Sequence, residues 1–213
     1  MMVLDKKIAE QTVNYLTQIN AIKLNTKNPF TWTSGIKSPI YCDNRLILSY
    51  PDVRKFIADK MTDIVKNKYG EDISIAGVAT GAIAIGAMIA ERLNLPYAYV
   101  RPEPKEHGLK NQIEGNIQEG SNVVVIEDLI STGKSSLNAI NALKFNGYNV
   151  MGMLSIFSYN FQFANKKFED ENISINSLSD YNSLVEIIES EGSLDDAEIS
   201  RLKKWREDPK TWS

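Results

Sequence analysis

The sequence predicts an α/β fold in which helices flank a central, mostly parallel sheet. Two unbroken apolar runs, ISIAGVA at 73–79 and VVVIED at 123–128, are typical of strands that are buried on both faces. Segments with helical periodicity follow these runs, at 81–94 and 133–147. Strands that alternate with helices in this way favour parallel pairing, with helices covering both faces of the sheet.

The composition indicates a globular protein with a single domain at 1–213. The 213 residues are 43% apolar and 24% charged, which is enough to bury a sizeable core. A net charge of −3 argues against a nucleic-acid-binding protein. Glycines interrupt the longest apolar stretch and the N-terminus is charged, so we expect no membrane span and no signal peptide. Cys42 is the single cysteine, which favours the reducing cytoplasm.

The N-terminal part of the chain predicts a small cap, at about 1–48, packed on the core. Apolar residues near helical spacing predict an amphipathic helix at 4–21. Asn-Pro, Ser-Gly and Ser-Pro turns then punctuate short strands up to about residue 45. Ser49 and Pro51 mark the start of the next helix, and Gly70 marks its end.

The rest of the chain alternates between strands and helices. The expected elements are strands at 73–79, 97–101, 123–128, 149–159 and 173–178, and helices at 81–94, 133–147, 180–191 and 195–207. Between 101 and 123 lies a loop of some twenty residues, and loops of that length inside a compact domain usually have a function.

Two adjacent carboxylates, Glu127 and Asp128, end the most apolar strand. In open α/β sheets, ligands bind beyond the carboxyl ends of the strands. The following LISTGKSS enters a helix whose first N–H groups can bind an anion, with hydroxyls from Ser131, Thr132, Ser135 and Ser136. Because successive strand residues point to opposite sides, one carboxylate is expected to face ligand hydroxyls while the other braces the loop or a metal.

Three other motifs share features with this part of the sequence. GKSS resembles the end of a Walker A loop, but Asp128 stands where that motif needs glycine. Gly77, Gly81 and Gly86 do not have the spacing of a dinucleotide-binding fingerprint. Two carboxylates that merely cap a helix remain the structural alternative, although two adjacent caps after VVVI are uncommon.

The stretch VVVIEDLISTGKS resembles the phosphoribosyl-diphosphate signature of the type I phosphoribosyltransferases. The resemblance implies that fold, with Glu127 and Asp128 at the ribose 2′- and 3′-hydroxyls and the loop at the 5′-phosphate. The implied binding residues in this stretch are Glu127, Asp128, Leu129, Ile130, Ser131, Thr132, Gly133, Lys134 and Ser135.

Two further stretches resemble elements of the orotate phosphoribosyltransferases. FTWTSGIKSPIYCDNR (30–45) is similar to their FTxxSGxKSP element, and YVRPEPKEHGLKNQIEG (99–115) to their flexible catalytic lid, here about 102–120. This resemblance implies orotate and phosphoribosyl diphosphate as substrates. It also implies Mg²⁺, held by the diphosphate, the ribose hydroxyls and Asp128.

The lid resemblance assigns three cationic residues to phosphoribosyl diphosphate. Arg101, Lys105 and His107 match its binding positions, and Lys105, His107 and Asp128 match catalytic positions. In the family the lid closes over the neighbouring subunit, which implies a homodimer. A solvated basic patch and a surface histidine are the alternatives from the residues alone.

The resemblance also places the base and the diphosphate. Ser131, Tyr41 and Cys42 match orotate-contacting positions, although Tyr41 and Cys42 are equally compatible with the core of a hairpin. Thr80 matches the diphosphate loop.

This chain departs from the family at three positions, where Thr33, Thr80 and Pro102 stand in place of lysines that some members carry. A phosphoribosyltransferase for another base and a non-catalytic sensor of phosphoribosyl diphosphate are the rival functions. FTWTSGIKSP argues against the first, and the acidic chain, without a basic helix, argues against the second.

Overall fold

A seven-stranded sheet forms the centre of the computed structural model, which describes residues 2–32, 35–103, 112–209 and 211–212. Its strand order is β1-β11-β10-β9-β6-β7-β8, and every neighbouring pair is parallel except the antiparallel pair β7–β8. The strands are β1 (Met2–Val3), β6 (Ser74–Val78), β7 (Tyr97–Val100), β8 (Ile113–Glu114), β9 (Asn122–Ile130), β10 (Asn149–Ser158) and β11 (Ile175–Asp180). The predicted α/β class and mostly parallel sheet are confirmed.

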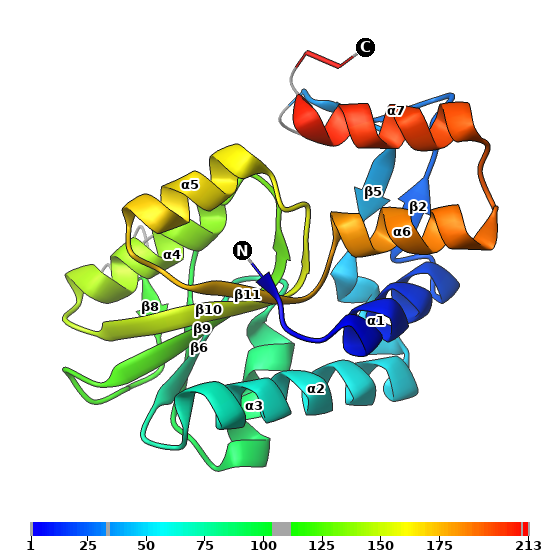
Figure 1. Cartoon of the computed structure of the whole chain (residues 1–213). Coiled ribbons are helices and arrows are strands. Elements are labelled where there is room, and N and C mark those ends of the chain that lie inside the picture. The colour runs from blue at the N-terminus through cyan, green and yellow to red at the C-terminus, as the bar shows by residue number, and fades with distance from the viewer. Residues whose placement is uncertain (1, 33–34, 104–111, 210, 213) are drawn as a thin grey trace.

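Helices cover both faces of this sheet, as Figure 1 shows. The helices α2 (Pro51–Tyr69) and α3 (Ile83–Leu93) lie on one face, and α4 (Lys134–Phe145) and α5 (Gln162–Asp170) lie on the other. The apolar side chains of β9 divide between two core clusters because strand residues alternate in direction. Val124 and Ile126 pack in the cluster with α2 and α3, whereas Val123 and Val125 pack in the cluster with α4 and α5.

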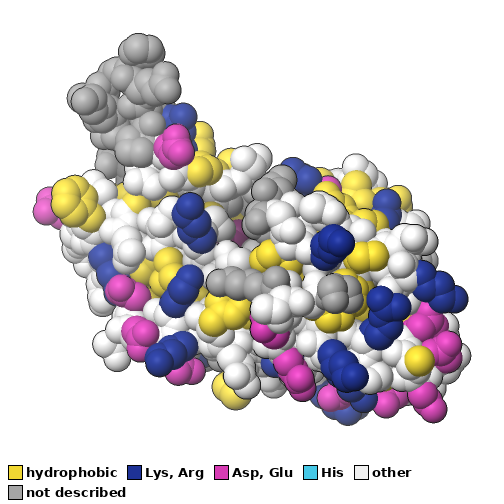
Figure 2. Space-filling view, turned by 90° about the horizontal axis from the view of Figure 1, so that it is seen from above, with side chains coloured by type: hydrophobic (Ala, Val, Ile, Leu, Met, Phe, Trp, Pro, Cys, Tyr) yellow, Lys and Arg dark blue, Asp and Glu magenta, His cyan; other side chains and the backbone are white. Residues whose placement is uncertain are grey.

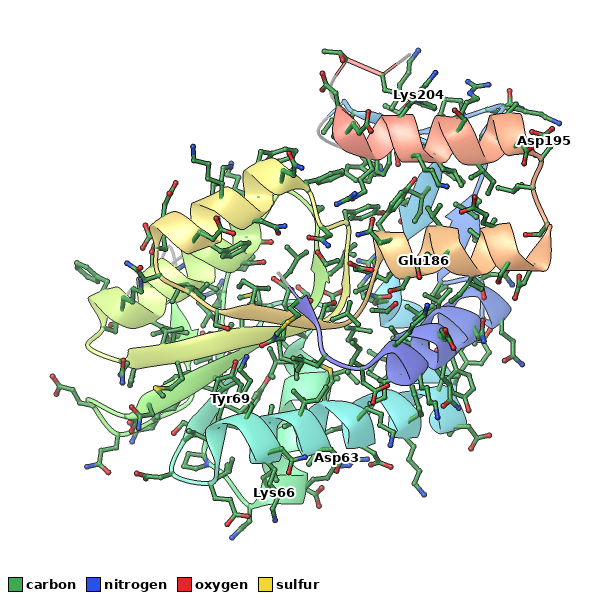
Figure 3. The ribbon with its side chains drawn as sticks, in the orientation of Figure 1. Asp63, Lys66, Tyr69, Glu186, Asp195 and Lys204 are labelled. Atoms are coloured by element: carbon green, nitrogen blue, oxygen red, sulfur yellow. The ribbon has the colours of Figure 1, made fainter. Side chains whose placement is uncertain are left out.

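The C-terminal end of α2 illustrates this covering layer. Figure 3 shows Asp63 and Lys66 pointing away from the sheet and Tyr69 pointing toward it. A Cβ atom added at Gly152 of β10 would lie 2.5 Å from the Tyr69 hydroxyl, so the glycine makes room for the phenol. The helix therefore packs directly against the strand.

The second lobe in Figure 1 contains elements from both ends of the chain. It contains α1 (Lys6–Gln18), β2 (Ile22–Leu24), β3 (Phe30–Thr31), β4 (Lys37–Ser38), β5 (Ile40–Cys42), α6 (Tyr181–Glu191) and α7 (Asp196–Glu207). We call β2–β5 together with α7 the cap. Trp205 of α7 donates from Nε1 to the Lys37 carbonyl at 2.9 Å, and Thr26 donates to Glu198 at 2.8 Å. The expected N-terminal cap thus includes a C-terminal helix as well.

Some elements differ from the sequence-based expectation. The strand β9 continues two residues beyond Asp128, and α1 is shorter than 4–21. The short strand β1 and the helix α5 were not predicted, and Tyr50, not Ser49, precedes the first turn of α2. Among the described residues, each helix is too short or too polar to cross a membrane. Figure 2 shows basic and acidic side chains interspersed on the face seen from above.

Candidate active site

Glu127 is buried between the sheet and α4. It lies on the same side of β9 as Val123 and Val125, and only 3% of it is exposed. Its carboxylate accepts from the Ser136 hydroxyl at 2.8 Å and from the Asp128 amide at 3.1 Å. Glu127 therefore links the end of β9 to the first turn of α4. Ser136, which the sequence suggested as a phosphate donor, is itself buried and used in this bond.

Asp128 points to the opposite side of β9 and is partly exposed. Its carbonyl accepts from Asn44 Nδ2 at 2.6 Å. A Cβ atom added at Gly81 would lie 2.2 Å from Asp128 Cγ. The Asp128 carboxylate therefore occupies space that any side chain at position 81 would fill. The two acids therefore lie on opposite sides of β9, as the alternation of the strand predicts, and Asp128 is the more exposed of the two.

Burial governs the protonation of both acids. It raises the pKa of the Glu127 carboxyl well above its usual range, and the adjacent charge of Asp128 raises that pKa further. Burial also raises the pKa of Asp128, although backbone hydrogen bonds and the charge of Arg45 oppose the rise. The folded protein thus disfavours ionisation of this pair when no ligand is bound.

This raised pKa predicts how stability depends on pH. Protonated Glu127 stabilises the fold fully below its unfolded pKa of about 4.3, and that contribution is lost as the pH rises through the higher folded value. Glutamine does not ionise, so Glu127→Gln should not lose this contribution. We therefore expect the free energy of unfolding of the variant, minus that of the wild type, to increase as the pH rises above about 4.3. Urea unfolding at a series of pH values measures the difference.

The control is the same substitution at exposed Glu186, whose side chain is 63% exposed and pairs with Lys6. The Glu186→Gln curve should run parallel to that of the wild type. A Glu127→Gln curve that also runs parallel would contradict the raised pKa.

The predicted phosphate loop connects β9 to α4. Gly133 adopts a φ of 76°, and a Cβ atom there would lie 2.9 Å from Phe168 Cε2, so this turn needs glycine for its backbone and its packing. Among the described residues, no side chain caps the N-terminus of α4, which leaves its first N–H groups for an anion. Ser131 and Thr132 are partly exposed, and Lys134 and Ser135 are exposed. Ile130 is buried, so only its backbone can face the loop.

A cavity of about 430 Å³ opens beside this loop. It is lined by Thr31, Trp32, Tyr41, Cys42, Leu129, Ser131, Thr132 and Tyr159. The resemblance assigned Tyr41, Cys42 and Ser131 to orotate. All three line this cavity. Burial raises the pKa of the Cys42 thiol, which is 3.3 Å from Asn44 Oδ1, so this thiol is a neutral part of the wall.

Aromatic rings back this cavity, and the sequence did not reveal them as site residues. The rings of Trp32 and Tyr159 lie 4.9 Å apart, and Trp205 of α7 lies edge-on to both at 5.7 Å. Trp205 is fully buried, so its role is to pack against these rings. Tyr159 directly follows β10, and its place at the carboxyl end of a strand was the available signal.

Two further predicted residues, Thr80 and Arg101, follow the neighbouring strands β6 and β7. Thr80 is exposed in the loop after β6, next to Gly81. Arg101 follows β7, and its Nη1 is 3.8 Å from Glu114 of β8. Lys105, His107 and Thr33 lie outside the described residues, so their predicted roles stay predictions.

Asp128 is the carboxylate of this pair that could bind a magnesium ion together with a phosphate-bearing substrate. Within the described part of the chain, no three His, Cys, Asp or Glu residues converge to hold a metal. Mg²⁺ commonly binds through one or two carboxylates together with substrate phosphates and water. Asp128, with its carboxylate partly exposed beside the phosphate loop, fits that arrangement, whereas Glu127 is committed to Ser136.

Comparison with known proteins agrees with this geometry. The sequence model of the phosphoribosyl transferase domain family matches residues 47–177. The chain is 47% identical to the orotate phosphoribosyltransferase of Phocaeicola vulgatus over 212 residues, which covers 100% of this chain and 98% of that protein.

Solved structures give the same result. The orotate phosphoribosyltransferase of Aeropyrum pernix superposes with a TM-score of 0.74 at 28% identity, covering 86% of this chain and 99% of that one. The Mycobacterium tuberculosis enzyme in complex with 5-phospho-α-D-ribosyl 1-diphosphate shares the fold, with a TM-score of 0.64 at 21% identity, covering 83% and 98%. The chain therefore belongs to the phosphoribosyltransferase family and, within it, to the orotate phosphoribosyltransferases.

Proposed function

We propose that this chain transfers the ribose 5-phosphate group from phosphoribosyl diphosphate to orotate, giving orotidine 5′-monophosphate and diphosphate in pyrimidine synthesis. The observation that carries the proposal is the continuity of the site. Asp128, the phosphate loop and the walls of the cavity at Leu129, Ser131 and Thr132 belong to one stretch of chain. A sugar, its phosphate and a planar base can thus bind side by side.

The reaction exchanges one bond at the anomeric carbon of the ribose. The bond to the diphosphate oxygen breaks, with its electron pair leaving on the diphosphate, and a bond forms to a ring nitrogen of orotate, which releases its proton to solvent. Asp128 accepts from the ribose hydroxyls, and the first N–H groups of α4 hold the 5′-phosphate. The cavity holds the base against Trp32 and Tyr159 and keeps water from the reacting carbon. Bound Mg²⁺ supplies positive charge that offsets the charge of the departing diphosphate.

The lid and the assembly extend this proposal. We infer that the side chains of Arg101, Lys105 and His107 bind the diphosphate. We also infer that the lid closes over the partner subunit of a homodimer. The resemblance of the lid supports this, as does the place of Arg101 at the end of β7, where ligands of parallel sheets bind. The single, buried thiol of Cys42 suits a reducing cytoplasm.

The function is tested by following the absorbance of orotate. With phosphoribosyl diphosphate and Mg²⁺ we expect orotate to be consumed, and chelation of the metal should stop the reaction. Uracil, adenine and hypoxanthine serve as competing bases. Consumption of one of these in place of orotate would show a different base specificity. Binding of phosphoribosyl diphosphate without turnover of any base would show a sensor.

A further inference from the structure

A buried amide joins the wall of the base cavity to the end of β9. Asn44 begins η1 (Asn44–Ser49), the short 3₁₀ helix that follows β5, and only 3% of it is exposed. Its Nδ2 donates to the Asp128 carbonyl at 2.6 Å, and its Oδ1 accepts from the Cys42 thiol at 3.3 Å. Both ends of the amide are used, and each bonds to a residue of the site.

The hydrogen bond from Asn44 to the Asp128 carbonyl lies just beyond the point where β9 stops pairing with β6. The register between β6 and β9 runs to the pair Gly77–Ile126, and β6 ends at Val78. On the other side, β10 still pairs with β9 at Glu127 and Leu129. The Asn44 amide thus bonds the main chain of β9 just past the end of the pairing with β6.

The side chain of Asp128 is restrained from a second direction. Its carboxylate lies where a Cβ atom at Gly81 would come within 2.2 Å of Cγ and of Oδ2. Gly81 therefore limits where the carboxylate can turn, and Asn44 fixes the backbone from which it projects. A carboxylate fixed in this way loses little conformational freedom when it binds a ligand.

We propose that Asn44 is a positioning residue, which acts on the reaction by holding Asp128 in the orientation that binds the ribose hydroxyls. The inference rests on the proposed function. Asn44 works through Asp128 and not by contact with substrate, so its contribution exists only while the Asp128 carboxylate is present. That condition makes the role measurable.

The test is a double-mutant cycle of Asn44→Ala and Asp128→Asn, read as kcat/KM for phosphoribosyl diphosphate. We expect Asn44→Ala alone to lower kcat/KM about tenfold, as the loss of a buried hydrogen bond can do. In the Asp128→Asn background the same change should lower it less than about twofold, because there is no carboxylate left to position. If Asn44→Ala lowers kcat/KM by the same factor in the wild type and in the Asp128→Asn variant, the two residues act independently and the proposal is overturned.

Two further variants separate the loss of the Asn44 hydrogen bond from poor folding and from a general loss of stability. Asn44→Leu preserves the approximate size of the side chain and lacks the donor, so it should reproduce the loss if Asn44→Ala folds poorly. Asn176 is a matched control in β11, because it is 2% exposed and its Nδ2 donates to the Met2 carbonyl at 3.3 Å. Asn176→Ala should lower the melting temperature and leave kcat/KM unchanged. An equal loss of kcat/KM in Asn176→Ala would show that general destabilisation explains the Asn44 effect.

The proposed function can fail separately from this inference. A wild-type chain that turns over no orotate refutes the function itself. An active wild type with an independent Asn44 effect refutes only the positioning role.

Discussion

Asp128→Asn is expected to lower kcat/KM for phosphoribosyl diphosphate about tenfold or more. An amide accepts hydrogen bonds from ribose hydroxyls less strongly than a carboxylate does and gives no charge to a metal, and such charge-assisted bonds contribute about 1.5–3 kcal/mol. Burial already raises the pKa of Asp128, so the neutral amide should not lower the melting temperature. Steady-state kinetics with varied phosphoribosyl diphosphate, together with thermal unfolding at neutral pH, measure both effects.

The matched control is Asp59→Asn on the outer layer of helices. Asp59 of α2 accepts from Arg92 Nε of α3 at 2.8 Å and is remote from the phosphate loop. Its kinetics should equal those of the wild type. Unchanged kinetics in the folded Asp128→Asn variant would remove Asp128 from the proposed ribose site.

Mixing two impaired variants, Lys105→Ala and Asp128→Asn, should raise activity above that of either variant alone. If the lid closes over the partner subunit, the two lesions lie in different halves of one composite site. In a mixed dimer one site then carries both lesions and the other carries neither, so each heterodimer gains one competent site. The measurement is orotate consumption after subunit exchange, with heterodimers counted by mass spectrometry.

A second mixture serves as its control. Gly81→Ala places a Cβ atom 2.2 Å from the Asp128 carboxylate and therefore damages the same half of the site as Asp128→Asn. Mixing these two should restore nothing, because each site of the heterodimer keeps one lesion. Heterodimers of Lys105→Ala and Asp128→Asn that are no more active than either variant alone would mean that the lid serves its own subunit.

The pattern of the sequence was sufficient for the layers of the fold and for the place of the site. Continuous apolar strands such as β9 predict burial on both faces, and Val123 to Ile126 do divide between the two core clusters. The same alternation predicts that Glu127 and Asp128 face opposite sides. Which of the two faces the ligand depends on where α4 packs, and the local sequence does not contain that information.

The parts that were missed depend on contacts between distant segments. The strand β1 has only two residues and exists by pairing with β11, so no periodicity can indicate it. Trp32 and Tyr159 are far apart in the sequence and line one cavity only because the cap packs beside the sheet, so local sequence could not identify them as cavity residues. Gly133 was predicted only as a binding residue of the phosphate loop. Its packing against Phe168 depends on α5, a helix that the sequence did not predict.

The packing of α7 on the cap has a consequence for how the protein is made. Translation adds the residues in chain order, so the sheet and the phosphate loop are complete before Trp205 of α7 leaves the ribosome. A nascent chain can therefore form the sugar-phosphate half of its site while the rings of Trp32 and Tyr159 still lack their buried partner. The aromatic packing behind the cavity is therefore completed only when α7 docks, because Trp205 contacts the rings of both Trp32 and Tyr159.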